Sequence, residues 1–183
     1  MMNTRKIIVA ITGASGAIYA VKLLERLRGL HTAVTGRVGH ADGPAGSMTG
    51  QSMPRQGYDE QAHRLTELPV DVAVILTGNA EEIMRYETGT GYTPSGNEKL
   101  WGNKDFNAPF ASGSSSYDTM IICPASMGMT GRIASGTSED LIARAADVML
   151  KERRRLIIVP RETPYNLIHI RNMETLTLAG AII

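Results

Sequence analysis

Short apolar runs alternate along the chain with longer segments in which apolar residues recur every three or four positions. The short runs lie at residues 6–12, 70–76, 120–123 and 156–159, with residues 181–183 as the start of a fifth. Each run is almost continuously apolar and rich in Ile and Val, which is typical of parallel strands with helices on both faces. The pattern therefore predicts buried strands at these positions.

Amphipathic segments separate the predicted strands. In the first of them, Ile18, Val21 and Leu24 share one helical face. Residues 137–140 provide a cap and early acidic residues for a later one. This alternation predicts an α/β protein, with a Rossmann-like (flavodoxin-like) doubly wound parallel sheet in three αβα layers and one domain over residues 1–183. The predicted helices are residues 16–28, 80–87, 127–134, 138–153 and 165–179.

Two long segments have no regular pattern. Residues 29–69 are rich in Gly, Ser, Met and Arg, and only residues 60–68 have the pattern of a short helix, so we expect a flexible surface insertion there. Residues 88–117 contain two prolines and the small-residue run 111–116. Such a run is either a flexible linker or a backbone that allows a ligand to approach closely.

Composition and charge argue against several classes of protein. A length of 183 residues suits one domain with a substantial core. The net charge of +1, with both signs interspersed, gives no reason to expect nucleic acid or an acidic membrane surface as a partner. The single cysteine, Cys123, suits a reducing compartment, and no apolar run has the length of a membrane span or a signal peptide. We therefore expect a cytoplasmic protein.

The turn after the first predicted strand carries the strongest functional signal. It reads Gly13-Ala14-Ser15-Gly16 and leads directly into a helix. A small-residue turn at this place exposes backbone N–H groups which, with the helix dipole, favour an anion such as phosphate. Ser15 can cap the helix or bind the ligand. The spacing is that of neither a dinucleotide fingerprint nor a P-loop, so an ordinary tight turn with a serine cap is the alternative.

Three further polar turns follow predicted strands, at residues 77–78, 124–129 and 160–162. Because ligands of open α/β sheets bind outside the carboxyl ends of the strands, we expect all four turns to form one site. The last turn contains Arg161 and Glu162 between prolines. A carboxylate beside an apolar ligand can serve as an acid or base, and a surface ion pair is the alternative interpretation.

A basic segment precedes that last turn. Arg144 and Lys151 are seven residues apart and therefore share one face of the predicted helix 138–153, where Lys151 could face a second phosphate. The charged run at residues 151–155 is otherwise typical of a solvated helix end, because cations there interact favourably with the helix dipole.

Six short motifs occur in a fixed order along the chain. They are Ile-Thr-Gly-Ala-Ser-Gly-Ala at 11–17, Ala-Ser-Gly-Ser at 111–114, Cys-Pro-Ala-Ser-Met at 123–127, Arg-Ala-Ala-Asp-Val at 144–148, Leu-Lys-Glu-Arg-Arg at 150–154 and Pro-Arg-Glu-Thr-Pro at 160–164. Together they resemble the flavin prenyltransferases, the UbiX-like proteins that include small subunits associated with hydroxyarylic acid decarboxylases. The resemblance covers residues 1–28 and 70–183.

This resemblance implies an activity and partners. Members of the family transfer a dimethylallyl group from dimethylallyl phosphate to N5 and C6 of reduced FMN, without a metal. The product, prenylated FMN, is the cofactor of UbiD-type decarboxylases of ubiquinone biosynthesis or aromatic acid decarboxylation. The family generally assembles as a homo-oligomer, a dodecamer with active sites between subunits. The chain would thus be a single flavin-binding domain.

The resemblance also implies roles for particular residues. Glu162 would be the acid/base residue, and Ser15 and Glu87 would also be catalytic. Ser112, Arg144 and Lys151 would surround the prenyl phosphate. Thr77 replaces a common Ser of the family, and Met129 replaces a frequent Thr. FMN would be held by Gly13, Ala14, Ser15, Thr77, Ser126, Met127, Gly128, Met129 and Arg161.

Two departures from the family keep two alternatives open. Family members usually continue beyond residue 183 with a Tyr and an Arg that bind the prenyl phosphate, and their connection at residues 29–69 is shorter. The chain could therefore be a non-catalytic FMN-binding or assembly subunit of a decarboxylase system. A flavin-dependent enzyme of the phosphopantothenoylcysteine decarboxylase type shares the fold, but no histidine here stands in its catalytic motif; the four are His31, His40, His63 and His169.

Overall fold

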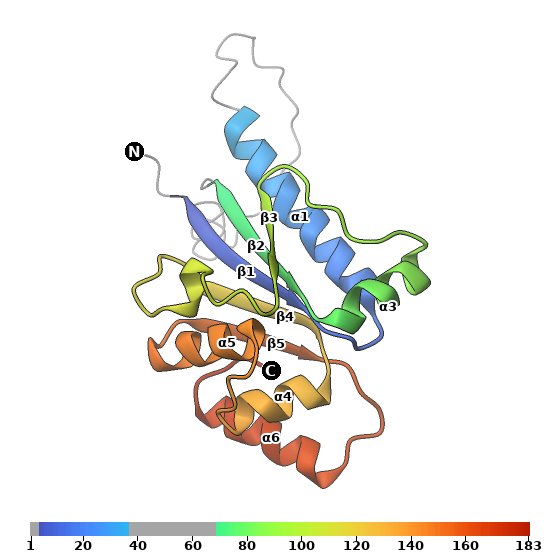
Figure 1. Ribbon diagram of the computed structural model, residues 1–183, viewed down its shortest axis with the longest axis vertical. Coiled ribbons are helices and arrows are strands. Elements are labelled where there is room, and N and C mark those ends of the chain that lie inside the picture. The colour runs from blue at the N-terminus through green and yellow to red at the C-terminus, as the bar shows by residue number, and fades with distance from the viewer. Residues whose placement is uncertain (1–3, 37–68) are drawn as a thin grey trace, which may run out of the picture.

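Five parallel strands form the central sheet of the protein, a computed structural model that describes residues 4–36 and 69–183 (Figure 1). The order across the sheet is β3-β2-β1-β4-β5. This is a doubly wound order, in which the direction of strand addition reverses between β1 and β4. The strands are β1 (Arg5–Ile11), β2 (Val70–Leu76), β3 (Glu98–Gly102), β4 (Thr119–Ala125) and β5 (Arg155–Pro160).

Helices cover both faces of this sheet, as Figure 1 shows. Helices α1 and α3 pack against one face. Helices α4 and α5, with the short 3-10 helix η2 (Pro109–Ala111), cover the other face, and α6 packs against α4. The predicted three-layer, doubly wound fold is therefore confirmed. The helices are α1 (Ala17–Gly36), α3 (Gly78–Thr88), α4 (Met127–Ala134), α5 (Leu141–Lys151) and α6 (Leu167–Leu178).

The two faces of the sheet have separate apolar cores. Successive side chains of a strand point to opposite faces, so Val9 of β1 packs with Leu24 of α1, whereas Ile8 packs with residues of α4 and α5. Both residues of β1 are fully buried. This double burial explains why the strands are apolar at every position rather than at alternate ones.

The prediction of irregular structure over residues 88–117 is wrong at β3. This edge strand pairs in parallel with β2 alone, so it is only partly covered: Trp101 is half-buried, and Lys99 and Leu100 are exposed. A half-exposed strand has no continuous apolar run to reveal it. The segment that follows is anchored too, because the buried ring of Phe110 meets the rings of Trp101 and Tyr117 edge-on.

A buried carboxylate attaches β3 to α1. The side chain of Glu98 is fully buried, and its two oxygens accept hydrogen bonds from Arg28 Nε at 2.6 Å and Nη2 at 2.8 Å. The hydroxyl of Tyr92 donates to the same carboxylate at 2.9 Å. Burial, and then this hydrogen bond, raise the pKa of Tyr92 above its ordinary value. Because removing one member would leave a buried charge unpaired, the cluster fixes the edge strand that borders the site.

The structure differs from the remaining predictions mainly at element ends. Helix α1 continues to Gly36, past its predicted end at residue 28. The rest of the predicted insertion, with the helical pattern at 60–68, lies outside the described residues. The predicted strand at 181–183 is a single parallel bridge between Ile182 and Ile157 of β5. No helix in the described part of the chain combines the length and the hydropathy needed to cross a membrane.

Candidate functional site

The four polar turns at the carboxyl ends of β1, β2, β4 and β5 are bonded to one another. Thr12 Oγ1 donates to the carbonyl of Pro124 at 2.8 Å and accepts from the backbone N–H of Ser126 at 2.8 Å. The N–H of Thr77 donates to Ile11 at 3.0 Å, and the N–H of Arg161 donates to Ala125 at 3.0 Å. The structure thus brings the four turns to one edge of the sheet, as the sequence predicts.

A polar pocket of about 300 Å³ opens between these turns. It lies beside the reversal of strand order between β1 and β4, which is where open α/β sheets bind their ligands. The pocket, here called the switch pocket, is lined by Gly13, Thr77, Gly78, Asn79, Asn103, Ser126, Arg132 and Asp140.

The start of α3 supplies unpaired donors to the switch pocket. Thr77 is the N-cap residue of α3, but its side chain makes no capping hydrogen bond. Its Oγ1 atom is buried and has no hydrogen-bond partner within the described residues. The first N–H groups of a helix also lack partners inside the helix. A buried hydroxyl beside a helix N-terminus fits an anionic ligand such as the phosphate of FMN, because such a ligand would satisfy both.

Close approach of the turn after β1 to α3 requires a glycine at position 13. A Cβ atom on Gly13 would lie 3.0 Å from Cβ of Asn79, closer than side chains normally pack. Gly16 has a φ of +101°, a backbone conformation that L-residues with a side chain rarely adopt. These two glycines therefore hold the turn against α3 and direct it into α1.

The protein's own carboxylate fills the anion position at the start of α1. Glu87 accepts hydrogen bonds from the N–H of Gly16 at 3.0 and 2.9 Å and from the N–H of Ala17 at 2.7 Å. The prediction that this turn leaves its N–H groups free for a phosphate is therefore wrong for Gly16 and Ala17. The physical reason is that α3 packs beside α1 and brings Glu87 to the helix start. Ser15 is half-buried, and within the described residues its hydroxyl does not cap α1 by a hydrogen bond.

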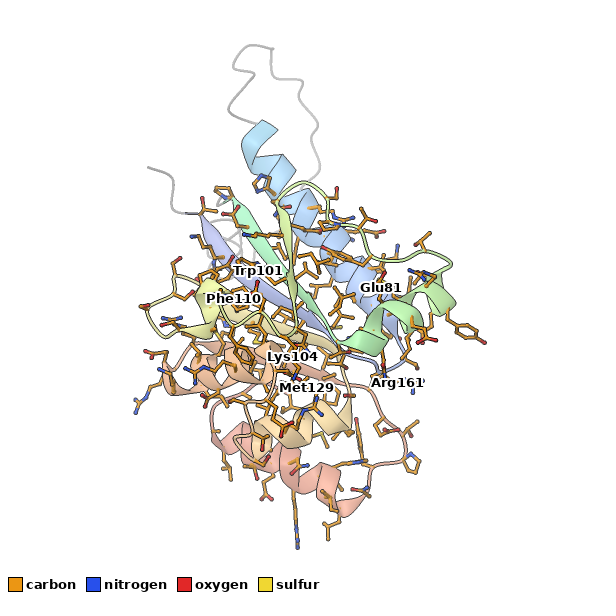
Figure 2. The ribbon with its side chains drawn as sticks, in the orientation of Figure 1. Glu81, Trp101, Lys104, Phe110, Met129 and Arg161 are labelled. Atoms are coloured by element: carbon orange, nitrogen blue, oxygen red, sulfur yellow. The ribbon has the colours of Figure 1, made fainter. Side chains whose placement is uncertain are left out.

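Arg161 lies against the same turn. Its Cγ atom is 3.7 Å from where a Cβ on Gly16 would be, although most of the side chain is exposed. Figure 2 shows it at the carboxyl end of the strands, near α3. Glu162 is exposed, and its Oε1 accepts a hydrogen bond from the N–H of Thr163 at 3.2 Å. Neither side chain forms an ion pair with any described residue, so the alternative of a surface ion pair is not observed.

The turn after β4 caps α4 and contributes both buried and exposed groups. Ser126 Oγ accepts from the N–H of Met129 at 3.3 Å. The side chains of Met127 and Met129 are buried, and Met129 belongs to the core cluster that includes α5. Gly128 is exposed. The structure thus places Ser126 in the switch pocket, whereas the side chain of Met129 packs in the core.

The residues predicted to bind the prenyl phosphate gather around the loop after η2. Arg144 Nε donates to the carbonyl of Ala111 at 3.0 Å. Lys151 Nζ donates to Glu152 Oε1 at 2.5 Å, and both of these side chains lie against Gly113. Beside them is an open pocket of about 520 Å³ lined by residues 106–109, 111–112 and 114–116. We call this region the basic edge, defined by Ser112, Gly113, Arg144 and Lys151.

The switch pocket and Lys151 of the basic edge lie at opposite ends of α5. Asp140, which lines the switch pocket, is the N-cap of α5, and Lys151 is the last residue of the same helix. Eleven helical residues span roughly 16 Å. Helix α5 ends at Lys151, shortly before β5 begins at Arg155 (Figure 1). One chain therefore does not bring Lys151 to the predicted flavin-binding residues, whereas Arg144 lies only about one helical turn after Asp140.

Four residues of the switch pocket were not found by sequence reasoning: Asn79, Asn103, Arg132 and Asp140. Asn103 directly follows β3, so it would have been found had that strand been predicted. Its backbone carbonyl accepts from the N–H of Leu141 at 2.8 Å, and its Oδ1 accepts from Ile142 at 3.2 Å. The end of β3 thus positions the start of α5.

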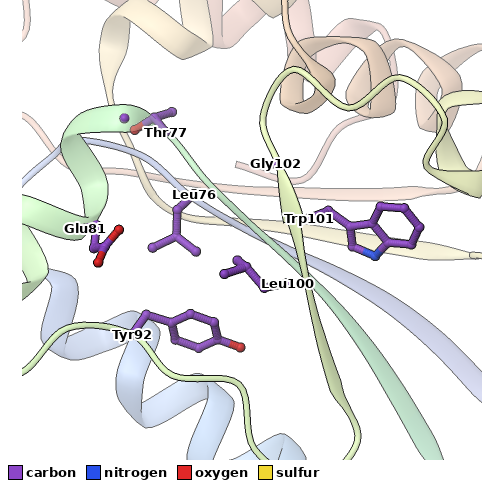
Figure 3. Close-up of a pocket in the computed structure, with 8 residues that line it drawn as sticks. Leu76, Thr77, Glu81, Tyr92, Leu100, Trp101 and Gly102 are labelled. Atoms are coloured by element: carbon purple, nitrogen blue, oxygen red, sulfur yellow. The ribbon is translucent and has the colours of Figure 1, made fainter.

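A second, smaller pocket of about 230 Å³ lies between α3 and the edge strand β3. Figure 3 shows Leu76, Leu100 and Tyr92 around it, with the Trp101 ring directed to the other side of β3. Thr77 lines both this pocket and the switch pocket. Throughout residues 4–36 and 69–183, no group of three His, Cys, Asp or Glu side chains could hold a metal ion.

Comparisons with known proteins identify the family and the fold. Residues 60–183 match the family described as Flavoprotein. The chain is 35% identical over 187 residues to flavin prenyltransferase UbiX of Pseudomonas aeruginosa, an alignment that covers 100% of this chain and 77% of that protein. The crystal structure of AnUbiX (PadA1) in complex with FMN and dimethylallyl pyrophosphate has a TM-score of 0.71 and 37% identity, over 99% of this chain and 77% of that one. A dodecameric FMN-dependent UbiX-like decarboxylase from Escherichia coli O157:H7 has a TM-score of 0.69 and 30% identity, over 97% and 78%.

Proposed function

Because this chain belongs to the Flavoprotein family and, within it, to the flavin prenyltransferases, we propose that it transfers a dimethylallyl group to reduced FMN bound in the switch pocket. The observation that carries the binding site is the buried, unpartnered hydroxyl of Thr77 beside the start of α3. The reaction breaks the C–O bond between the dimethylallyl group and its phosphate, and joins the allyl carbons to N5 and C6 of the flavin in place of the hydrogens on these two atoms. One of the two displaced protons is taken up by the allyl double bond, and the other is released with the phosphate. Reduced FMN supplies the electron-rich N5 and C6 atoms.

The turns around the switch pocket would hold the flavin. Gly13 and Ala14 allow the backbone to approach it, and the hydroxyls of Thr77 and Ser126 donate to it. Ser126 can do so because its oxygen accepts the capping bond from Met129 while its hydrogen is still available. Met127 and Gly128 continue the same turn, and Arg161 lies against the turn after β1.

Glu162 is the acid/base residue of this proposal, because its carboxylate is exposed at the site edge and has no cationic partner among the residues that the structure describes. Ser15 places a half-buried hydroxyl beside Gly16. Glu87 acts on the same turn by fixing the N–H groups of Gly16 and Ala17. Glu87 would therefore contribute to catalysis by holding the backbone at the start of α1 in place.

The phosphate of the second substrate would be bound by the basic edge of a neighbouring copy of the chain. Lys151 of the basic edge lies roughly 16 Å along α5 from Asp140 of the switch pocket, so a second copy is needed to bring its ammonium group to the flavin. The UbiX-like relative from Escherichia coli is dodecameric, and we propose the same homo-oligomer for this chain. Cations at the departing phosphate stabilise its negative charge, so this proposal involves no metal.

The product and its destination complete the proposal. Prenylated FMN would be passed to a UbiD-type decarboxylase, and neither nucleic acid nor a membrane is needed as a partner. A reducing cytoplasm suits both reduced FMN and the single buried thiol of Cys123, whose pKa is raised by burial.

The decisive experiment is an anaerobic incubation of the protein with reduced FMN and either dimethylallyl phosphate or dimethylallyl pyrophosphate. We expect the mass of the bound flavin to increase by one C5H8 unit with at least one of the two donors, together with a changed flavin spectrum. Flavin that is bound but unmodified with both donors would instead support a non-catalytic FMN-binding subunit. Protein that takes up no FMN would refute the proposed function as a whole.

A further inference from the structure

Arg132 is the only cation among the side chains that line the switch pocket. It lies on α4, past the Ser126 cap, and its Nε atom is buried without a hydrogen-bond partner within residues 4–36 and 69–183. The nearest acid is Asp140, whose Oδ2 is 3.6 Å from Arg132 Nη2. That separation is too long for a good hydrogen bond, so the ion pair does not satisfy the guanidinium.

The other contacts of this pair leave Arg132 available to a ligand. Asp140 Oδ1 already accepts the N–H of Ala143 at 2.9 Å as the cap of α5. Arg132 Nη2 otherwise contacts only the sulfur of Met129, at 3.8 Å, which is a weak acceptor. A buried N–H donor without an acceptor is unfavourable, and an oxygen atom of a ligand in the pocket would relieve it.

Three kinds of group at the switch pocket can donate a hydrogen bond and lack an acceptor among the described residues. They are the hydroxyl of Thr77, the N–H groups of Gly78 and Asn79 at the start of α3, and the Nε of Arg132. A ligand that satisfies all three must present several acceptor oxygens close together, ideally with negative charge. A phosphate does so, whereas the edge of a flavin ring alternates acceptors with an N–H donor.

We propose that Arg132 binds the phosphate group of FMN, together with Thr77 and the start of α3, and so makes the site selective for FMN over riboflavin. This inference depends on the proposed function only in placing the flavin in the switch pocket.

Titration of FMN and of riboflavin into flavin-free protein, followed by flavin fluorescence, tests the proposal. Arg132→Ala should weaken FMN binding on the order of 10- to 100-fold and leave riboflavin binding unchanged, because only FMN has the charged acceptor. Arg132→Lys should recover part of the FMN affinity. Lys104→Ala is the matched control: it removes one positive charge from the pocket's surroundings, where Lys104 donates to the carbonyl of Glu139, without changing the pocket lining.

Asp140→Asn should change the FMN affinity in the opposite direction. Asn can still cap α5, but it removes the negative charge that faces the phosphate, so FMN binding should tighten a few-fold while riboflavin binding stays unchanged. Thermal unfolding of each flavin-free variant shows whether it is folded.

Three outcomes would overturn the inference: equal losses for both ligands in Arg132→Ala, no loss for FMN, or an Asp140→Asn variant with unchanged or weaker FMN binding. In each of these cases the proposed function still stands as long as the wild-type protein binds FMN. Wild-type protein that binds no FMN refutes the proposed function itself.

Discussion

The switch pocket and the basic edge contain similar kinds of polar groups but differ in how those groups are paired. In the switch pocket, backbone bonds hold the turns, and side-chain donors such as Thr77 Oγ1 and Arg132 Nε have no partner among the residues that the structure describes. At the basic edge the cations are already paired: Lys151 with Glu152, and Arg144 with Asp147 and the carbonyl of Ala111.

This difference indicates that one chain forms a complete binding site at the switch pocket only. Unpartnered buried donors favour a ligand because they gain a hydrogen bond without losing one. Exposed ion pairs must exchange one partner for another, so a phosphate gains less from the basic edge alone. The basic edge would therefore become effective when a neighbouring copy places a flavin and its substrate beside it.

The largest expected effect comes from the acid/base residue beside the switch pocket. Glu162→Gln should lower kcat on the order of 10²- to 10⁴-fold, because it removes a proton-transfer group, while FMN affinity stays unchanged since Glu162 does not line the pocket. Product formation with reduced FMN, followed by flavin mass, gives the rate. Unchanged turnover would remove Glu162 from the mechanism.

Mixed oligomers test whether the two regions act in different copies of the chain. If each site combines Glu162 of one copy with Lys151 of another, randomly assembled Glu162→Gln and Lys151→Ala chains should have both wild-type residues in about a quarter of the sites. Assayed with dimethylallyl phosphate well below the KM, where Lys151→Ala sites are slow, the mixture should regain about a quarter of wild-type activity. Oligomers of either variant alone serve as controls. Activity no higher than the sum of these controls would show that one copy supplies both residues.

Lys151→Ala tests the basic edge alone. We expect the KM for dimethylallyl phosphate to rise about 10-fold, because one charged hydrogen bond to the phosphate is lost, with FMN affinity nearly unchanged. Steady-state kinetics and FMN titration measure the two quantities separately. Arg153→Ala is a suitable control, since Arg153 is an exposed cation two residues away. Equal losses of both substrates would indicate that Lys151 is a structural residue.

How much of this comparison could be predicted from the sequence depends on where each residue lies. The turns with Gly13, Thr77, Ser126 and Arg161 follow nearly continuous apolar runs, so the pattern located these turns and their common edge. Asn103 was missed because β3 is an edge strand with only one neighbour and no continuous apolar run.

Contacts between distant parts of the chain were not predictable from local pattern. Glu87 reaches the start of α1 from a position 70 residues further along the chain, and only the packing of α3 against α1 reveals it. Arg132 likewise looks like any cation on a short helix until Asp140 and Thr77 are seen in the same pocket. The separation of the basic edge from the switch pocket depends on the length and direction of α5, which the sequence placed only approximately.

A smaller effect is expected from removing the hydroxyl of Thr77, which lacks a hydrogen-bond partner among the described residues. Thr77→Val keeps the side-chain shape but removes the buried Oγ1 that lacks a partner. FMN affinity should fall about 5- to 10-fold, whereas the free energy of unfolding of the flavin-free protein should stay the same or rise by about 1 kcal/mol. Fluorescence titration and thermal or urea unfolding give the two values. A loss of stability without flavin would mean that the hydroxyl has a structural partner.

The smallest effect is expected at the basic edge, where Lys151 is already paired with Glu152. A hydrogen bond from Lys151, and then the charge of Lys151, lower the pKa of Glu152. The carboxylate is therefore ionised and paired with Lys151 near neutral pH. The pair is fully formed above the ordinary pKa of a glutamate carboxyl, and it is lost as the pH falls through the lowered pKa of Glu152. Glu152→Gln should therefore free Lys151 and lower the KM for dimethylallyl phosphate about two- to threefold at neutral pH, with kcat unchanged. The difference between variant and wild type should shrink on acidification, when the wild-type carboxyl is also neutral. A KM that rises in Glu152→Gln would instead show that Glu152 holds Lys151 in its binding position, and the basic edge would then be prearranged within one chain, as the switch pocket is.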